Sequence, residues 1–134
     1  MKKDISIPEV KNVTFAIIRK KNETDDFIWE VHLLNSNDFV LDNILVMSRG
    51  YGSVKDEKVE TSTLRHFFDK VGANDTLLVE PIDPNLFVLN NEFALTYYVE
   101  GEIFFKKFMF TAGAMDEANL THISRLQAEG ILHS

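Results

Sequence analysis

The chain has 134 residues, which suits one hydrophobic core, and we expect a single domain over residues 1–134. Its formal net charge is −7, so phosphate backbones repel its surface and nucleic acid is not an expected partner. It contains no cysteine, which excludes disulfides, thiol catalysis and cysteine-based zinc or iron–sulfur sites.

The N-terminal residues 1–8 have a basic beginning but lack the apolar segment that a secretion signal needs. No stretch of the chain approaches the ~18 apolar residues that span a bilayer. We therefore expect a cytoplasmic protein without a membrane partner.

Short strands at intervals of roughly ten residues dominate the first half of the chain. We expect strands over 13–19 and 27–34. In the second strand Phe27, Trp29, Val31 and Leu33 share a face. We expect this face to point into the core and Trp29 to be buried. Polar residues 35–38 then form a turn.

A third strand is expected over 44–48, ending in Arg49-Gly50-Tyr51-Gly52. The two glycines indicate a β-bulge or a turn with positive φ. The segment 59–68 is a fourth strand candidate, and a helix over 63–71 is the alternative there.

The next two strands are followed by the clearest hairpin in the sequence. We expect a turn at 72–75, a strand over 76–82, and a hairpin of 93–99 with 102–111. Glu100-Gly101 forms its turn, with the glycine in the left-handed conformation. Lys106 and Lys107 interrupt an aromatic run, which is typical of an edge strand that must not pair with other chains.

The C-terminal segment has two interpretations. Residues 114–128 form a helix ended by Gly130, or one helical turn at 116–119 precedes an extended stretch. We favour the second, with a last short strand at 131–133.

About seven strands without long helices between them predict an all-β fold. We expect an immunoglobulin-like antiparallel β-sandwich with a short C-terminal helix as an option, and a small β-barrel is the alternative.

Three stretches resemble a small uncharacterised bacterial family of Bacteroidetes type. They are residues 48–52, which include the motif RGYG, residues 61–68, with the sequence TSTLRHFF, and residues 89–93. The resemblance runs along most of the chain. The family has no established function, so the resemblance implies no site residues.

No metal, cofactor or catalytic signature is present in the sequence. The four histidines lie far apart, without His-x-His or His-Glu-x-x-His spacing, so we expect no metal site and no cofactor. Ser48, Ser53 and Ser62 are not in a Gly-x-Ser-x-Gly elbow. We therefore expect a protein that is not an enzyme.

Aromatic residues occur in adjacent pairs, which places apolar groups on both faces of a sheet. The pairs are Phe67-Phe68, Tyr97-Tyr98 and Phe104-Phe105. One face fills the core, and the other needs a cover. The pattern predicts a non-catalytic interaction module that binds a protein partner or itself as a homodimer.

We expect Arg49, Tyr51 and Arg65 to mark its interaction surface, because Arg and Tyr offer large contact areas with directional hydrogen bonds. An ordinary surface ion pair between Arg49 and Glu60 is the alternative. A second hypothesis is a small-ligand binder or enzyme with a polar pocket near Arg49, Tyr51, Arg65 and His66.

A third hypothesis is a secreted adhesion domain, which rests on the sandwich and on four Asn-x-Thr sequons. The sequons begin at Asn12, Asn22, Asn74 and Asn119. Because Asn favours turns and Thr favours the strand that follows, we interpret them as structural.

Overall fold

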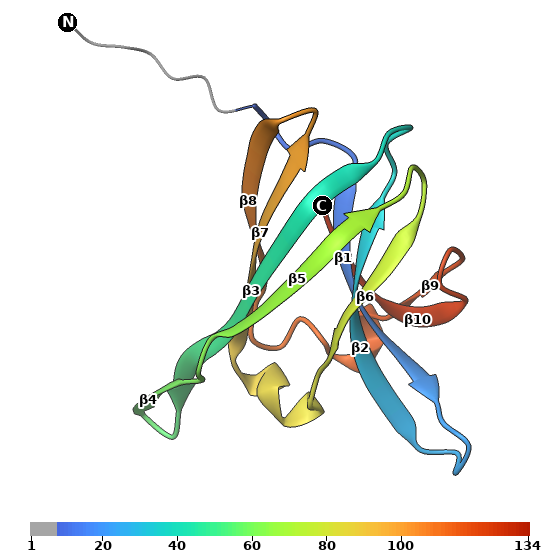
Figure 1. Ribbon diagram of the computed structural model, residues 1–134. Coiled ribbons are helices and arrows are strands. Elements are labelled where there is room, and N and C mark those ends of the chain that lie inside the picture. Colours follow the sequence, from blue (N-terminus) through green and yellow to red (C-terminus); the bar gives the residue numbers. More distant parts are fainter. Residues whose placement is uncertain (1–7) are drawn as a thin grey trace, which may run out of the picture.

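Two antiparallel β-sheets face each other in the computed structural model, which describes residues 8–134 (Figure 1). Sheet A contains, in spatial order, β6 (Thr76–Pro81), β2 (Phe27–Asn35), β1 (Val13–Lys21), β10 (Ala128–His133) and β9 (Thr121–Ile123). Sheet B contains β4 (Glu57–Glu60), β3 (Leu41–Val54), β7 (Asn90–Val99) and β8 (Glu102–Phe110), with β5 (Leu64–Val71) also paired to β3. Within residues 8–134 the sheets do not close into a barrel, so the all-β sandwich is confirmed.

The remaining elements are two short 3₁₀ helices, η1 (Pro84–Val88) and η2 (Glu117–Asn119). No helix in residues 8–134 is long and apolar enough to cross a membrane. The expectation about a secretion signal concerns a segment that lies almost wholly outside the described residues.

Strand β3 runs through the two glycines at which we expected a bulge or turn. Gly50 and Gly52 pair regularly with β7 and β4, and neither has a positive φ. Both lie against Leu89, and a Cβ at Gly50 would sit 3.3 Å from Leu89 Cδ1. That expectation was wrong: these glycines make room for a neighbouring side chain within a continuous strand.

The segment expected as one strand over 59–68 forms two strands, and the alternative helix over 63–71 is wrong. Strands β4 and β5 pair with successive parts of β3 and are interrupted at 61–63. Thr61 anchors the segment between β4 and β5 to β3. Its N–H donates to Gly50 O and its Oγ1 accepts from Gly50 N, each at 2.8 Å.

The β7–β8 hairpin confirms its predicted turn. Glu100 and Gly101 have φ of 49° and 82°, the two left-handed positions of a type I′ turn. Strand β8 lies at the edge of sheet B, as its lysines indicated. The C-terminal segment also follows the favoured interpretation, because η2 is a single turn and extended strands follow it.

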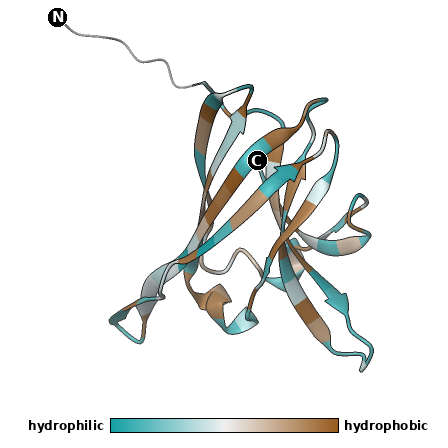
Figure 2. Cartoon of the chain, viewed as in Figure 1, coloured by the Kyte–Doolittle hydropathy of each residue, from teal (hydrophilic) through white to brown (hydrophobic). Residues whose placement is uncertain are grey.

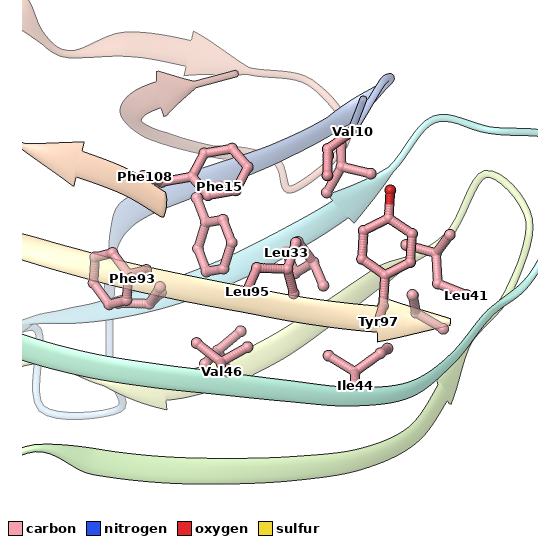
Figure 3. Close-up of a cluster of buried hydrophobic side chains, with 14 of the residues drawn as sticks. Val10, Phe15, Leu33, Leu41, Ile44, Val46, Phe93, Leu95, Tyr97 and Phe108 are labelled. Carbon is pink, nitrogen blue, oxygen red and sulfur yellow. The ribbon is translucent and has the colours of Figure 1, made fainter. Parts of the chain in front are cut away.

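The main core fills the space between the sheets (Figure 3). Phe15 of β1 packs at its centre, with ring centroids 5.4 Å from Phe93 and 4.7 Å from Phe108. In Figure 2 hydrophobic and hydrophilic bands alternate along the strands, which is the period-two pattern that predicted them.

Trp29 faces this core but is half-buried, so its predicted burial was wrong. The β1–β2 hairpin projects beyond the rest of the sandwich (Figure 1), and Phe27 near its tip is 48% exposed. Phe87 of η1 covers one edge of Trp29, with ring centroids 4.9 Å apart at 80°.

A fully buried amide ties two turns together at the opposite end of β2. Asn35 Nδ2 donates to the carbonyls of Phe39 and Gly72, each at 2.9 Å. Its Oδ1 accepts from the backbone N–H and the side chain of Asn37, each at 3.0 Å. All polar atoms of the Asn35 amide are therefore used.

Three of the four sequon asparagines occupy turns, as their structural interpretation predicted, whereas Asn119 ends η2. Asn12 adopts a left-handed φ of 58° directly before β1, and Asn74 adopts a φ of 54° two residues before β6. Asn22 Oδ1 accepts from the N–H groups of Thr24 and Asp26 in the β1–β2 turn.

Candidate functional site

Strand β3 separates two candidate sites, because its side chains alternate between the faces of sheet B. Ser48 points inward and is 6% exposed, whereas the side chain of Arg49 points to the outer face and is 35% exposed. The outer face of sheet B and the interior pocket beneath it are described in turn.

An apolar row crosses the outer face of sheet B. Cross-strand pairing places Leu45 between Phe67 and Thr96, and Thr96 beside Phe105. Phe67 is 76% exposed, more than any other large hydrophobic side chain in residues 8–134, and Phe105 is 48% exposed. We call these four residues the apolar row.

The adjacent aromatic pairs divide between the two faces, as the sequence predicted. Phe68 packs against the core while Phe67 points outward, and the pair Phe104-Phe105 divides in the same way. Tyr97 is 2% exposed and stacks on Phe104 at 5.0 Å, whereas Tyr98 lies on the outer face beside Ile103.

Next to the apolar row lies a hollow of about 450 Å³. Its walls are Leu45, Phe67 and Thr96 of the row together with Tyr98 and Asp69. The hollow is shallow and mostly apolar, which suits a protruding side chain better than an enclosed small ligand.

Arg49 and Tyr51, which we predicted as surface anchors, are in direct contact. The Arg49 guanidinium lies 4.6 Å from the centre of the Tyr51 ring, a cation–π geometry. Arg49 Nε donates to Glu92 Oε2 at 3.1 Å, and Nη1 donates to Glu60 Oε1 at 3.2 Å. The hydrogen bond to Glu92 is the main reason why the pKa of Arg49 lies above its usual value.

The alternative ion pair with Glu60 is therefore present, and a stronger contact to Glu92 accompanies it. Arg65 lies on the same outer face, opposite Met47, and its side chain is exposed. A recognition role for Arg49, Tyr51 and Arg65 stays a prediction.

The polar pocket expected near Arg49, Tyr51, Arg65 and His66 forms only in part. A hollow of about 670 Å³ on the outer face is lined by Arg49, Tyr51, Lys58 and Glu60, whereas Arg65 and His66 do not line it. His66 lies opposite Val46, which is fully buried, so it points into the sandwich while Arg65 points outward. Arg65 and His66 cannot contribute to one pocket, because adjacent residues in a strand face opposite ways.

An interior pocket of about 280 Å³ lies between the sheets where β5 and β6 meet η1. Its wall is mainly apolar, formed by Leu64, Ile82, Leu86 and Phe93. Ser48, Asn91 and Glu80 contribute polar groups. Glu80 is 8% exposed, so this pocket contains a nearly buried carboxylate.

Two hydrogen bonds hold that carboxylate. Ser48 Oγ donates to Glu80 Oε1 at 2.8 Å, and His66 Nε2 contacts the same oxygen at 2.8 Å. An ionised carboxylate accepts hydrogen bonds and cannot donate them, so Nε2 of His66 is the donor in this contact when Glu80 is ionised.

A β-bulge explains why Glu80 faces inward. The pairing of β6 with β2 shifts by one residue, so Glu80 lies opposite Val31 and Leu78 lies opposite His32. Val79 is the extra residue, and both Val79 and Glu80 are buried. Without the shift, the regular alternation would turn Glu80 to the outer face.

The group of Ser48, His66 and Glu80 differs from a nucleophilic triad. In a triad the histidine accepts the proton of the nucleophile, whereas here Ser48 donates to the carboxylate. No hydrogen bond joins Ser48 to His66 within the described chain. Residues 8–134 also contain no cluster of three or more His, Cys, Asp or Glu side chains that would hold a metal ion.

A second histidine–carboxylate contact lies on the outer face of sheet A. His32 Nε2 and Lys20 Nζ each lie 3.1 Å from Glu30 Oε1. Burial raises the pKa of Glu30, but hydrogen bonds from His32 and Lys20 outweigh it and hold the pKa below its usual value. Nδ1 of His32 is buried without a partner in residues 8–134.

No protein-family model, curated protein or solved structure matches the chain. The resemblance to a Bacteroidetes-type family stays a prediction. Two of the stretches that carry it, 48–52 and 61–68, are neighbours in space, because Thr61 bonds to Gly50 and β5 pairs with β3.

Glu80 was not among the residues predicted from the sequence. The signal for it is a carboxylate inside the apolar run 77–82, which a strand can accommodate only with a bulge or a buried partner.

Proposed function

We propose that the protein is a non-catalytic interaction module that binds a protein partner through the outer face of sheet B. The observation that carries the proposal is the 76% exposure of Phe67 within the apolar row. Fully covering an aromatic side chain contributes about 1.5–3 kcal/mol, and the row offers two of them. A face with this composition is more stable when it is covered.

The charged groups beside the row support a protein partner. Arg49 is held by Glu92 and Glu60 and stacks on Tyr51, so little side-chain freedom is lost when a partner binds. Protein interfaces typically combine an apolar centre with a polar rim, and they are enriched in Arg and Tyr.

The partner is another protein or a second copy of this chain. A stable interface buries about 800 Å² on each side. Four strands contribute side chains to the outer face of sheet B, namely β5, β3, β7 and β8.

We also propose that the sandwich is immunoglobulin-like. In that fold strands A, B and E share one sheet and C, F and G share the other. Strands β1, β2 and β6 are neighbours in sheet A, and β3, β7 and β8 are neighbours in sheet B, which supports this assignment.

We also propose a cytoplasmic location, which the absence of cysteine supports.

The test is the double variant Phe67→Ser with Phe105→Ser. Leu78→Ser is the matched control, because Leu78 is 48% exposed on the outer face of the other sheet. The oligomeric mass in solution and the proteins captured from native lysate are measured for all three chains. Loss of self-association or of a specific partner in the double variant alone supports the proposal. Equal behaviour of all three chains contradicts it.

A further inference from the structure

We propose that the interior pocket binds a small molecule that carries a primary ammonium group on a compact apolar body. This inference goes beyond the interaction surface and does not depend on it. It rests on Glu80, on the acceptors beside it and on the apolar wall around them.

The first observation is a carboxylate oxygen that is left free. Oε1 of Glu80 is used by Ser48 and His66, whereas Oε2 makes no hydrogen bond within residues 8–134. In residues 8–134, His32 Nδ1 is the only side-chain nitrogen or oxygen that is both buried and without a hydrogen-bond partner, so Oε2 of Glu80 is not buried. Oε2 is therefore reached by solvent, and the pocket that Glu80 lines provides this access.

The second observation is another free acceptor in the same pocket. Asn91 Nδ2 donates to the carbonyls of Leu86 and Leu89 at 3.0 and 3.1 Å, which fixes the orientation of the amide. Its Oδ1 lies toward Gly50 and has no partner in the described residues. Glu80 of β6 and Asn91 of β7 belong to opposite sheets and both line the pocket. An ammonium group has three donors and no acceptor, so it fits a pocket with two free acceptors.

The third observation is that no cationic side chain of residues 8–134 bonds to Oε2 of Glu80. The nearest arginine, Arg49, contributes to the rim of the pocket, but its guanidinium is engaged by Glu92 and Glu60 on the outer face. His66 bonds to Oε1 and leaves Oε2 free. An ionised carboxylate in a mainly apolar pocket favours a ligand that brings the opposite charge.

The fourth observation sets the rest of the ligand. The rest of the wall is mainly apolar and includes Leu64, Ile82, Leu86 and Phe93, and the volume is about 280 Å³. This lies at the lower limit for small-molecule sites, which begin at about 300 Å³. It suits an apolar body about the size of one aromatic ring. Leu64 is 50% exposed and Ser62 is exposed, so the mouth lies at the start of β5.

The carboxylate is already oriented before a ligand arrives. Ser48 lies on sheet B and Glu80 on sheet A, and their hydrogen bond fixes the Glu80 side chain across the interior. A fixed acceptor loses little conformational entropy on binding, which raises the affinity of a small cation.

The test uses benzylamine, whose protonated form carries the proposed head group, and benzyl alcohol, which has the same shape without the charge. Both are titrated into the full isotope-labelled chain, and backbone NMR shifts give the affinity and the location. We expect benzylamine to shift residues around Ser48, Glu80 and Phe93 and to bind at least about tenfold more tightly than benzyl alcohol, as charge-assisted hydrogen bonds imply.

Glu80→Gln is the decisive variant, because it removes the charge and keeps the oxygen that Ser48 and His66 use. Glu30→Gln is the matched control, since the Glu30 side chain is also mostly buried, at 12% exposed, but lies on the outer face of sheet A and does not line the pocket. We expect Glu80→Gln to abolish the preference for benzylamine and Glu30→Gln to keep it. Equal affinity for the two probes in the unmodified chain, shifts located elsewhere, or no binding at millimolar concentrations overturns the proposal. Leu64→Trp at the mouth should weaken both probes without unfolding the chain.

Discussion

Ser48 and Glu80 belong to opposite sheets, and Ser48 Oγ donates to Glu80 Oε1 at 2.8 Å. This hydrogen bond crosses the interior of the sandwich, where apolar side chains make nearly all other contacts. It joins the sheets at a defined point and positions the carboxylate that the pocket presents.

Ser48→Ala should therefore destabilise the fold by about 1.5–3 kcal/mol, the range for a hydrogen bond to a charged group. Ser53→Ala is the control, because Ser53 is exposed near the end of the same strand. Urea unfolding of the three chains measures the difference. Equal midpoints for both variants would show that the inter-sheet bond contributes nothing.

The effect of substituting Asn35 should depend on whether the new side chain can still donate hydrogen bonds. Asn35→Ala leaves the carbonyls of Phe39 and Gly72 without donors and should destabilise by about 1–3 kcal/mol. Asn35→Asp places an acceptor against the same two carbonyls and should destabilise more at neutral pH. Thermal unfolding ranks the variants, and the reverse order would contradict the assigned amide orientation.

Trp29→Ala should destabilise by about 2–3 kcal/mol, less than the roughly 3–5 kcal/mol typical of a fully buried aromatic residue. The reason is that Trp29 is half-buried and shares its contact with Phe87 of η1. Phe87→Ala should shift the tryptophan emission to longer wavelength by uncovering the ring. An unchanged spectrum would mean that the edge contact does not form in solution.

Burial raises the pKa of Tyr97 to about 12, from 10.0 for an exposed tyrosine. Between these values the unfolded chain has lost the phenolic proton and the folded chain retains it. The folded state therefore binds more protons, and stability falls as the pH rises from 10 to 12, by about 2–3 kcal/mol in total. Chemical denaturation at pH 8 and at about pH 11 measures roughly half of this loss, since pH 11 lies midway between the two pKa values.

Tyr97→Phe should remove that part of the alkaline loss, whereas Tyr98→Phe should retain it, because Tyr98 lies on the outer face. If both variants lose the same stability at alkaline pH, the loss comes from the ionisation of groups other than Tyr97.

Much of the architecture could be predicted from the sequence, because half-buried strands repeat with a period of two. The faces of β2 and the division of the pair Tyr97-Tyr98 follow directly from that period. The β7–β8 turn was predictable because Glu-Gly suits two left-handed positions.

The interior pocket could not be predicted, because its residues are joined by tertiary contacts alone. Ser48 and Glu80 are 32 positions apart and meet only when the sheets pack. The glycines of β3 were misread for the same reason, since the side chain that needs their space is Leu89. Local patterns identify strand faces but carry no information about what approaches a strand from another sheet.

The extra residue in β6 has a consequence for how chains of this type should be aligned. Leu77 before the bulge and Glu80 after it both face inward, and Val79 lies between the two registers. A related chain that is one residue shorter at this point would regain ordinary alternation and keep its carboxylate inside. An alignment should therefore place a single-residue gap at Val79, which keeps the pocket carboxylates aligned. An alignment without that gap would wrongly suggest that the shorter chain lacks the carboxylate.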